Sequence, residues 1–265
     1  MRVYNLYSML PVTAAYAAPV EHGKHLLDIY RPSSTGAHSV VIFIHGGGLT
    51  EGDRTWYRAV GSSLADGGYV AVIPSYRYYP AADPNGSAHD VVDAIAWTAM
   101  HIANYGGNPK HIILIGHSAG GWMVDLAMMN RALWTGTGFS HAPVAAAAYF
   151  SGDFADIMYP TPGESAADRA TDVKLAGPPG ESRARFSPDR YPPARVPWLL
   201  VCATHDDPGT CDDRDAYAKA LRRDSIPATV FTDRGTHMGE VEHFHTIGSQ
   251  LRTVFDEWVL KVRSI

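Results

Sequence analysis

The sequence predicts an α/β protein built on a mostly parallel sheet, with helices on both faces. From about residue 25 onward, strand-like segments alternate with segments of helical periodicity, as they do when crossover helices join parallel strands. Several of the expected strands are continuous apolar runs, which is typical of strands covered on both faces. One of these runs ends in Gly-x-Ser-x-Gly and passes directly into a helical segment.

The first half of the chain contains four expected strands, each a short run of branched or aromatic apolar residues. They are residues 26–30 (LLDIY), 40–44 (VVIFI), 69–73 (YVAVI) and 112–115 (IILI). Three expected helices cover residues 56–65, 88–105 and 119–130. The first two end at glycine pairs, which favour helix termination, and the second carries an apolar stripe with a period of about 3.6 residues.

The second half returns to the sheet three times. Expected strands occupy residues 143–150, 198–203 and 228–231, and expected helices occupy residues 215–223 and 247–262. Between the first two of these strands, residues 153–196 lose apolar periodicity and are rich in Pro, Gly, Ser, Arg and Asp. An excursion of this kind usually forms the lid or wall of a substrate site. We therefore expect a single domain, 1–265, with a small lid-like excursion over residues 153–196.

Composition excludes several classes of protein. Of the 265 residues, 46% are hydrophobic and 18% are charged, which is the balance of an ordinary globular domain. The net charge of −5 and the lack of a basic stripe give no basis for nucleic-acid binding. No run of about 18 apolar residues is present to span a membrane. Nothing in the pattern predicts an oligomeric state.

The N-terminus weakly imitates a signal peptide. Arg2 precedes an apolar stretch that ends in alanines, but Asn5 and Pro11 interrupt its apolar part. We expect a mature N-terminal segment in a cytoplasmic protein, and a secreted or periplasmic location is the alternative.

The chain has two cysteines, Cys202 and Cys211, which are too few for a disulfide scaffold. We expect two free thiols. A local disulfide across the intervening loop is the alternative, because the two residues are close in sequence.

Residues 116–120 (GHSAG) present one serine, Ser118, at the junction of an expected strand and an expected helix. This pattern fits a nucleophile elbow, a tight turn whose strained backbone requires small residues on either side of the nucleophile. The N-terminus of the following helix also favours negative charge that develops there. We predict that Ser118 is a catalytic nucleophile.

A serine nucleophile needs a base within hydrogen-bond reach and an acid to orient that base. In sheets of this type the order along the chain is serine, acid, histidine, and each partner follows a later strand. Asp206 follows the strand 198–203, and we prefer it to Asp207, which precedes a proline and fits a turn. His237 follows the last strand after a Gly-Thr turn. We predict a triad of Ser118, Asp206 and His237.

A glycine run, residues 45–48 (HGGG), follows the strand 40–44. Successive glycines leave backbone N–H groups uncovered, as an oxyanion hole requires. We predict that Gly47 and Gly48 donate to the oxyanion, together with Ala119, the residue after the nucleophile. The run lacks the pattern of a phosphate-binding loop, and no lysine follows it.

With these residues in place, the chain resembles the hormone-sensitive-lipase-like esterases of the α/β-hydrolase fold, especially their small bacterial branch. The resemblance covers most of the chain and rests on residues 45–48 (HGGG), 105–109 (YGGNP) and 116–121 (GHSAGG). It implies hydrolysis of carboxylic esters without a cofactor, with matching residues at all three triad positions. The YGGNP stretch is also similar to isoprenylcysteine methylesterases, and residues 237–242 (HMGEVE) are similar to arylformamidases.

We therefore expect a carboxylesterase that acts on small or short-chain substrates through an acyl-enzyme, because an excursion of about forty residues provides only a modest lid. One alternative is an arylformamidase, which would cleave the amide of N-formylkynurenine with the same triad. Another, of a different class, is a non-catalytic ligand-binding homologue of the fold. A metal site is not expected, since residues 236–245 (THMGEVEHFH) lack the H-E-x-x-H pattern, and Glu240 and Glu242 fit the exposed polar start of a helix.

Overall fold

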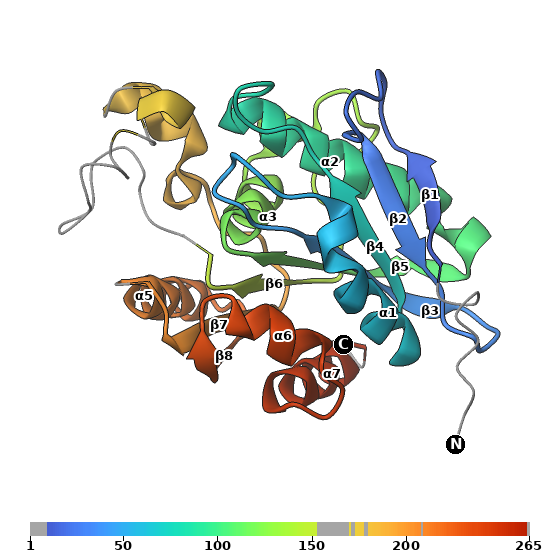
Figure 1. Cartoon of the computed structure of the whole chain (residues 1–265). Helices are drawn as coiled ribbons and strands as arrows, with labels where there is room; N and C mark the ends of the chain where they lie inside the picture. The colour runs from blue at the N-terminus through green and yellow to red at the C-terminus, as the bar shows by residue number, and fades with distance from the viewer. Residues whose placement is uncertain (1–9, 153–169, 171–172, 178–179, 208, 264–265) are drawn as a thin grey trace.

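The computed structural model describes residues 10–152, 170, 173–177, 180–207 and 209–263 (Figure 1). Nearly half of the expected lid-like excursion, including residues 153–169, lies outside the described residues. The described part of the chain contains the sheet and the helices that cover it.

One sheet of eight strands forms the centre of the molecule, in the order β1-β2-β4-β3-β5-β6-β7-β8. The strands are β1 (Val12–Ala15), β2 (Leu26–Tyr30), β3 (His38–Ile44), β4 (Val70–Ser75), β5 (Gly107–His117), β6 (Ala146–Phe150), β7 (Trp198–His205) and β8 (Ala228–Thr236). β2 pairs antiparallel with both β1 and β4, and every pairing from β4 to β8 is parallel. The carboxyl ends of these parallel strands therefore meet at one edge of the sheet.

Helices cover both faces of the sheet, as Figure 1 shows. The α-helices are α1 (Arg58–Asp66), α2 (Pro84–His101), α3 (Ala119–Met129), α5 (Thr210–Arg223), α6 (Gly239–His245) and α7 (Gln250–Val262). Short 3-10 helices are η2 (Arg54–Tyr57), η3 (Ile102–Tyr105), η4 (Arg131–Trp134), η5 (Glu181–Phe186) and η6 (Pro188–Arg190). Apolar residues of α2, α3 and α5 belong to one core cluster, and those of α1, α6 and α7 belong to the other.

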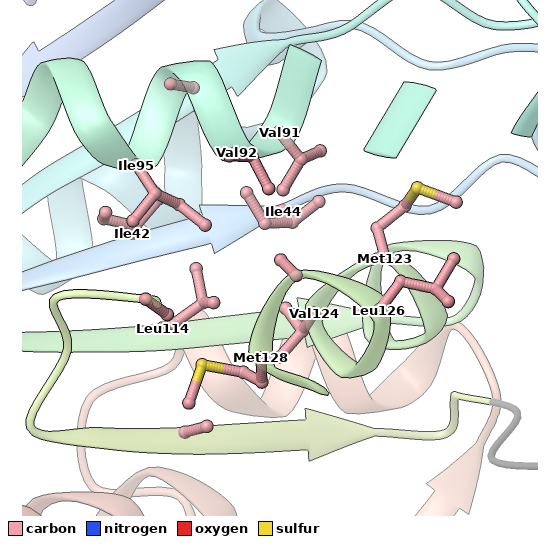
Figure 2. Close-up of a cluster of buried hydrophobic side chains, with 14 of the residues drawn as sticks. Ile42, Ile44, Val91, Val92, Ile95, Leu114, Met123, Val124, Leu126 and Met128 are labelled. Carbon is pink, nitrogen blue, oxygen red and sulfur yellow. The ribbon is translucent and has the colours of Figure 1, made fainter. Parts of the chain in front are cut away.

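The two clusters explain why the central strands are apolar at every position. Ile42 and Leu114 point to the cluster beneath α2 and α3, where Figure 2 shows them facing Ile95 and Val124. Their neighbours along the strands, such as Phe43, belong to the cluster on the opposite face. Because both faces are covered by helices, the alternation of apolar and polar residues disappears.

The predicted architecture is confirmed, and the departures are local. β1 was not predicted, because it is a short edge strand with mostly exposed residues and has no apolar pattern. The expected closing helix, residues 247–262, is in fact α7, and the shorter α6 precedes it. The expected helix 88–105 begins earlier, at Pro84, where the Asp83 side chain accepts a hydrogen bond from the Gly86 N–H and caps it.

A buried ion pair joins α2 to the end of β4. Asp90 is 2% exposed and accepts hydrogen bonds from Arg77 at both carboxylate oxygens, at 2.7 Å from Nη2 and 2.9 Å from Nε. The backbone N–H of Arg77 also donates to Asp90, at 2.8 Å. These bonds fix the segment that follows β4, next to the strand that leads to the glycine run.

We predict that Asp90→Ala destabilises the protein by about 2 kcal/mol. Removing one partner of a fully buried pair costs about 3–5 kcal/mol, but the Arg77 side chain is 37% exposed, so water screens part of the loss. Urea denaturation measures the change. The control is Asp93→Asn on the same helix, expected within about 0.5 kcal/mol of wild type. Equal losses in the two variants would contradict a special role for the Arg77 pair.

Candidate active site

Ser118 occupies the turn between β5 and α3. Its backbone has φ 55° and ψ −130°, a conformation that L-residues rarely adopt. Small neighbours are required here, because a Cβ on Gly116 would overlap the carbonyl of Gly120, and a Cβ on Gly120 would overlap the carbonyl of Ile44. The Ser118 N–H donates to Phe150 O at 2.9 Å, which ties the turn to β6. The turn thus has the geometry of the predicted nucleophile elbow.

The glycine run after β3 passes directly over this turn. A Cβ on Gly46 would lie 2.9 Å from both the Ser118 Cβ and the His117 carbonyl oxygen, so only glycine fits at this approach. Gly47 and Gly48 have φ values of +119° and +55°. Within the described residues, no hydrogen bond uses the N–H of Gly47, Gly48 or Ala119. These three groups are available to an oxyanion beside Ser118, although that role stays a prediction.

His45 holds the glycine run in place. The ring is fully buried and stacks on Tyr76 at 4.4 Å between centroids, and its Nδ1 lies 2.7 Å from Gly46 O. Burial lowers the pKa of His45 to about 4, so the ring is neutral and Nδ1–H donates to that carbonyl. The Tyr76 hydroxyl donates to His45 O at 2.7 Å. Neutral, buried side chains therefore fix the backbone of the predicted oxyanion site.

Asp206 and His237, predicted from separate loops, lie together in the structure. His237 Nδ1 is 2.7 Å from Asp206 Oδ1. Since the carboxylate accepts from Nδ1–H, Nε2 is the nitrogen that carries the lone pair of the neutral ring. Asp207, the rejected alternative, is exposed and donates its backbone N–H to Asp206 Oδ1 at 2.9 Å.

Several donors surround the Asp206 carboxylate. Besides His237 and the Asp207 N–H, it accepts from the Ala203 N–H at 3.0 Å and from the Ser151 hydroxyl. Burial acts to raise the pKa of Asp206, but these hydrogen bonds outweigh it and lower that pKa to about 2. Asp206 is therefore ionised at neutral pH and can hold the His237 ring in one tautomer.

His117 ties His237, the predicted base, to the elbow. Its Nε2 lies 2.9 Å from the backbone oxygen of His237, and the two rings are 4.8 Å apart between centroids. Burial, with a further contribution from His237, lowers the pKa of His117 to about 4. The neutral His117 ring donates from Nε2 to this backbone oxygen. Because His117 directly precedes Ser118, the bond holds the His237 loop beside the elbow.

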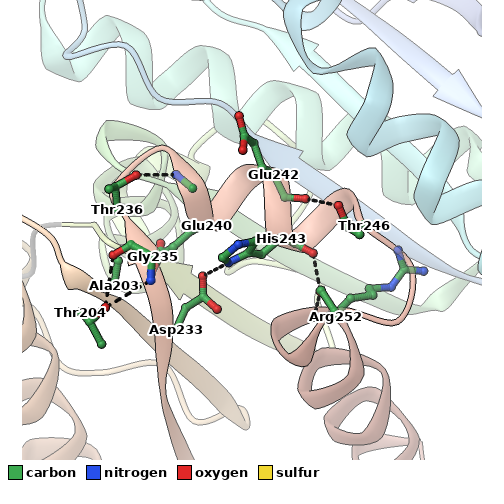
Figure 3. A network of polar contacts seen from close by, with 12 residues as sticks. Ala203, Thr204, Asp233, Gly235, Thr236, Glu240, Glu242, His243, Thr246 and Arg252 are labelled. Atoms are coloured by element: carbon green, nitrogen blue, oxygen red, sulfur yellow. Dashed lines mark hydrogen bonds and ion pairs between the residues drawn. The ribbon is translucent and has the colours of Figure 1, made fainter.

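The carboxyl ends of β7 and β8 are also joined to each other (Figure 3). The Gly235 N–H donates to Thr204 Oγ1 at 3.2 Å. His243 of α6 lies 2.6 Å from Asp233 of β8, between Nδ1 and Oδ2. These contacts fix the helix that follows His237 relative to the strand that precedes it.

Sequence reasoning missed two residues beside Asp206. Glu240 was expected at an exposed helix start, and this was wrong: its side chain is fully buried, and its Oε2 lies 2.7 Å from the hydroxyl of Ser151. Burial raises the pKa of Glu240 to about 8, with smaller contributions from Asp206 and Asp233. No local signal in the sequence indicated this, because α6 is a short helix with two acidic residues, of which Glu240 is buried and Glu242 is exposed.

The expectation of two free thiols was also wrong, because Cys202 and Cys211 form a disulfide. The bond joins the end of β7 to the first turn of α5 and closes the loop that carries Asp206. It therefore restrains the predicted catalytic acid as well as the fold.

We predict that replacing both cysteines by alanine destabilises the protein by about 2–3 kcal/mol, because the bond closes a loop of about ten residues. Turnover falls as well, since the Asp206 loop gains freedom. Urea denaturation and initial rates measure the two effects. Thiol titration of unfolded wild-type protein, purified without reductant, provides the control, and detection of two free thiols there would rule the bond out.

One group of possible metal ligands occurs in the described part of the chain, made of Asp206, Asp207 and His237. The bond between His237 Nδ1 and Asp206 already uses two of the three in a histidine–carboxylate pair. The expectation that no cofactor is needed stays a prediction.

Residues 27–140 match the family model described as BD-FAE. Over 114 residues the chain is 32% identical to a probable isoprenylcysteine alpha-carbonyl methylesterase of Oryza sativa subsp. japonica, covering 43% of this chain and 27% of the relative. It is 33% identical over 138 residues to the probable carboxylic ester hydrolase LipM of Mycobacterium tuberculosis, covering 49% of this chain and 30% of the relative. The matched region thus spans less than a third of the length of these relatives.

Solved structures show the same fold over nearly the whole chain. Esterase B from Lactobacillus Rhamnosis superposes with a TM-score of 0.78 at 20% identity, covering 96% of this chain and 85% of that one. Esterase 2 of Thermogutta terrifontis, phosphonylated by sarin, gives 0.76 at 19% identity and covers 95% of both chains. The predicted α/β-hydrolase fold is therefore confirmed. None of the described helices combines the length and apolar content that crossing a bilayer requires.

Proposed function

We propose that this α/β-hydrolase-fold chain is a carboxylesterase-type serine hydrolase that cleaves small or short-chain esters. The observation that carries the proposal is the convergence, at one edge of the sheet, of the strained Ser118 turn, the overlying glycine run and the Asp206–His237 pair. The relatives named as ester hydrolases agree with it.

The reaction proceeds in two steps. His237 accepts the proton of the Ser118 hydroxyl through Nε2, and Ser118 attacks the ester carbonyl. The N–H groups of Gly47, Gly48 and Ala119 stabilise the oxyanion, and the protonated His237 gives its proton to the leaving alcohol. Water then repeats the attack on the acyl-enzyme and releases the acid.

Asp206 stabilises the imidazolium that forms in each step. Because its pKa is far below that of imidazolium, the proton stays on His237 rather than passing to the carboxylate. The carboxylate needs only to remain ionised and correctly oriented.

The disulfide is relevant to the cellular compartment in which the protein works. Such a bond persists where thiols are not kept reduced, which favours the secreted or periplasmic alternative over the predicted cytoplasmic location.

We predict that Ser118→Ala lowers kcat on p-nitrophenyl butyrate by about three orders of magnitude or more, because triad members act as a unit. The variant also loses labelling by a fluorophosphonate probe. Ser140→Ala, at an exposed serine, is the matched control and keeps wild-type rates and labelling. Near-normal hydrolysis by Ser118→Ala would contradict the assignment.

A substrate panel tests the specificity part of the proposal. We expect kcat/KM to be highest for acetyl and butyryl esters and to fall towards lauroyl esters. N-formylkynurenine belongs in the same panel, since a higher kcat/KM on that amide than on any ester would favour the arylformamidase alternative. A wild-type chain that neither turns over a substrate nor labels would favour a ligand-binding protein.

A further inference from the structure

We propose that Glu240 is a positioning residue of the active site, a neutral carboxylic acid that donates a hydrogen bond to Ser151, which in turn donates to Asp206. The inference rests on the proposed hydrolase function and adds two residues behind the triad. It gives a directed chain of hydrogen bonds from Glu240 through Ser151 and Asp206 to His237.

The direction of this hydrogen-bond chain is set by the number of protons available. The Ser151 hydroxyl lies within hydrogen-bond distance of two carboxyl groups, Asp206 and Glu240, and has a single hydrogen to donate. If both carboxyl groups were ionised, one of the two Ser151 contacts would have no hydrogen between its two oxygens. One carboxyl must therefore carry a proton and donate it to the Ser151 oxygen.

The other contacts place that proton on Glu240. Asp206 accepts from three further donors, the N–H groups of Ala203 and Asp207 and the His237 ring, so its negative charge is satisfied. Glu240 is fully buried, and its Oε1 has no hydrogen-bond partner among the described residues. A buried charge without donors is far more costly than a neutral carbonyl oxygen in the same place.

The charged groups near Glu240 lie on three elements, and their net effect disfavours a negative charge on Glu240. Asp206, in the loop after β7, and Asp233 of β8 both disfavour a further negative charge. Arg214 of α5 opposes them, but it binds Asp215 at 2.8 Å and the backbone oxygen of Phe231 at 2.9 Å. Glu240 therefore stays protonated at neutral pH and loses its proton as the pH rises through about 8.

This arrangement positions both partners of the nucleophile. Ser151 follows β6 and holds the second oxygen of Asp206, so that the first oxygen faces His237 Nδ1. Glu240 lies three residues after His237 at the start of α6, so its bond to Ser151 also restrains the loop that carries the base. A small displacement of either partner is costly, because misplacement by about 1 Å can lower a rate about a hundredfold.

Four single variants and one double variant, Glu240→Leu combined with Ser151→Ala, test the proposal, each assayed for hydrolysis of p-nitrophenyl butyrate between pH 6 and pH 10. Glu240→Gln keeps a donor for Ser151 and cannot ionise, whereas Glu240→Leu fills the space and removes the donor. Ser151→Ala removes the hydroxyl that joins Glu240 to Asp206 and so interrupts the chain of hydrogen bonds. Glu242→Gln makes the same chemical change two residues along α6 at an exposed position and is the matched control.

The proposed chain of hydrogen bonds predicts a distinct result for each of these variants. Wild type and Glu242→Gln lose kcat with an inflection near pH 8, where ionisation of Glu240 puts a second charge beside Asp206. Glu240→Gln stays within about threefold of wild type at pH 7 and lacks that inflection. Glu240→Leu and Ser151→Ala lower kcat about tenfold or more with little change in KM, and the double variant is no worse than either single one.

Thermal unfolding gives a second readout that does not depend on catalysis. The pKa of Glu240 is raised from 4.5 to about 8 in the folded state, so the folded protein holds a proton that the unfolded chain releases. Glu240 therefore contributes stability that is fully present below about pH 4.5 and is lost as the pH rises to about 8, and the comparison with Glu240→Gln isolates this contribution from that of other titrating groups. Glu240→Gln removes this dependence, and its Tm advantage over wild type grows across that range.

Two outcomes overturn the proposal. One is equal kcat in Glu240→Gln and Glu240→Leu, and the other is a pH inflection that persists in Glu240→Gln with no growth of its Tm advantage. Failure of the proposed function is recognised separately, because wild type itself would then show neither ester hydrolysis nor fluorophosphonate labelling, while the Tm comparison would still report on Glu240.

Discussion

Close contact between two backbones is the constraint on which the site depends. The glycine run after β3 and the turn after β5 approach so closely that a Cβ on Gly46 would lie 2.9 Å from Ser118 Cβ. β3 and β5 are adjacent parallel strands, so this contact forms where their carboxyl ends leave the sheet. Only glycine fits at such an approach, and the same approach brings N–H groups to the side of the serine.

The parallel sheet extends this arrangement to the remaining partners. β6, β7 and β8 follow β5 in order across the sheet, and their carboxyl ends carry Ser151, Asp206 and His237. Each side chain lies just beyond the end of its strand, and contacts from neighbouring strands restrain these segments: His117 of β5 holds the His237 backbone, and the Gly235 N–H of β8 bonds to Thr204 of β7. The disulfide adds a covalent restraint to the loop that holds Asp206.

The pKa values in this region differ from those of the same residues in water, and the balance between burial and hydrogen bonding sets the direction of each shift. His45 and His117 are neutral donors to backbone oxygens because burial lowers the pKa of each to about 4. Asp206 stays charged because hydrogen bonds outweigh its burial, whereas Glu240, which lacks such donors, has a pKa raised to about 8. The balance between burial and hydrogen bonding therefore gives neutral, charged and proton-donating groups within one cluster.

The sequence by itself determined the sheet, the elbow and the placement of Asp206 and His237 after β7 and β8. These features depend on local constraints: a strand buried on both faces must be apolar throughout, and a strained turn must have small neighbours. The tertiary structure alone decided the burial of Glu240, its bond to Ser151 and the pairing of the two cysteines. Ser151 is 89 residues from Glu240 and 55 from Asp206 in the chain, so no local pattern could show that one hydroxyl joins two carboxyl groups.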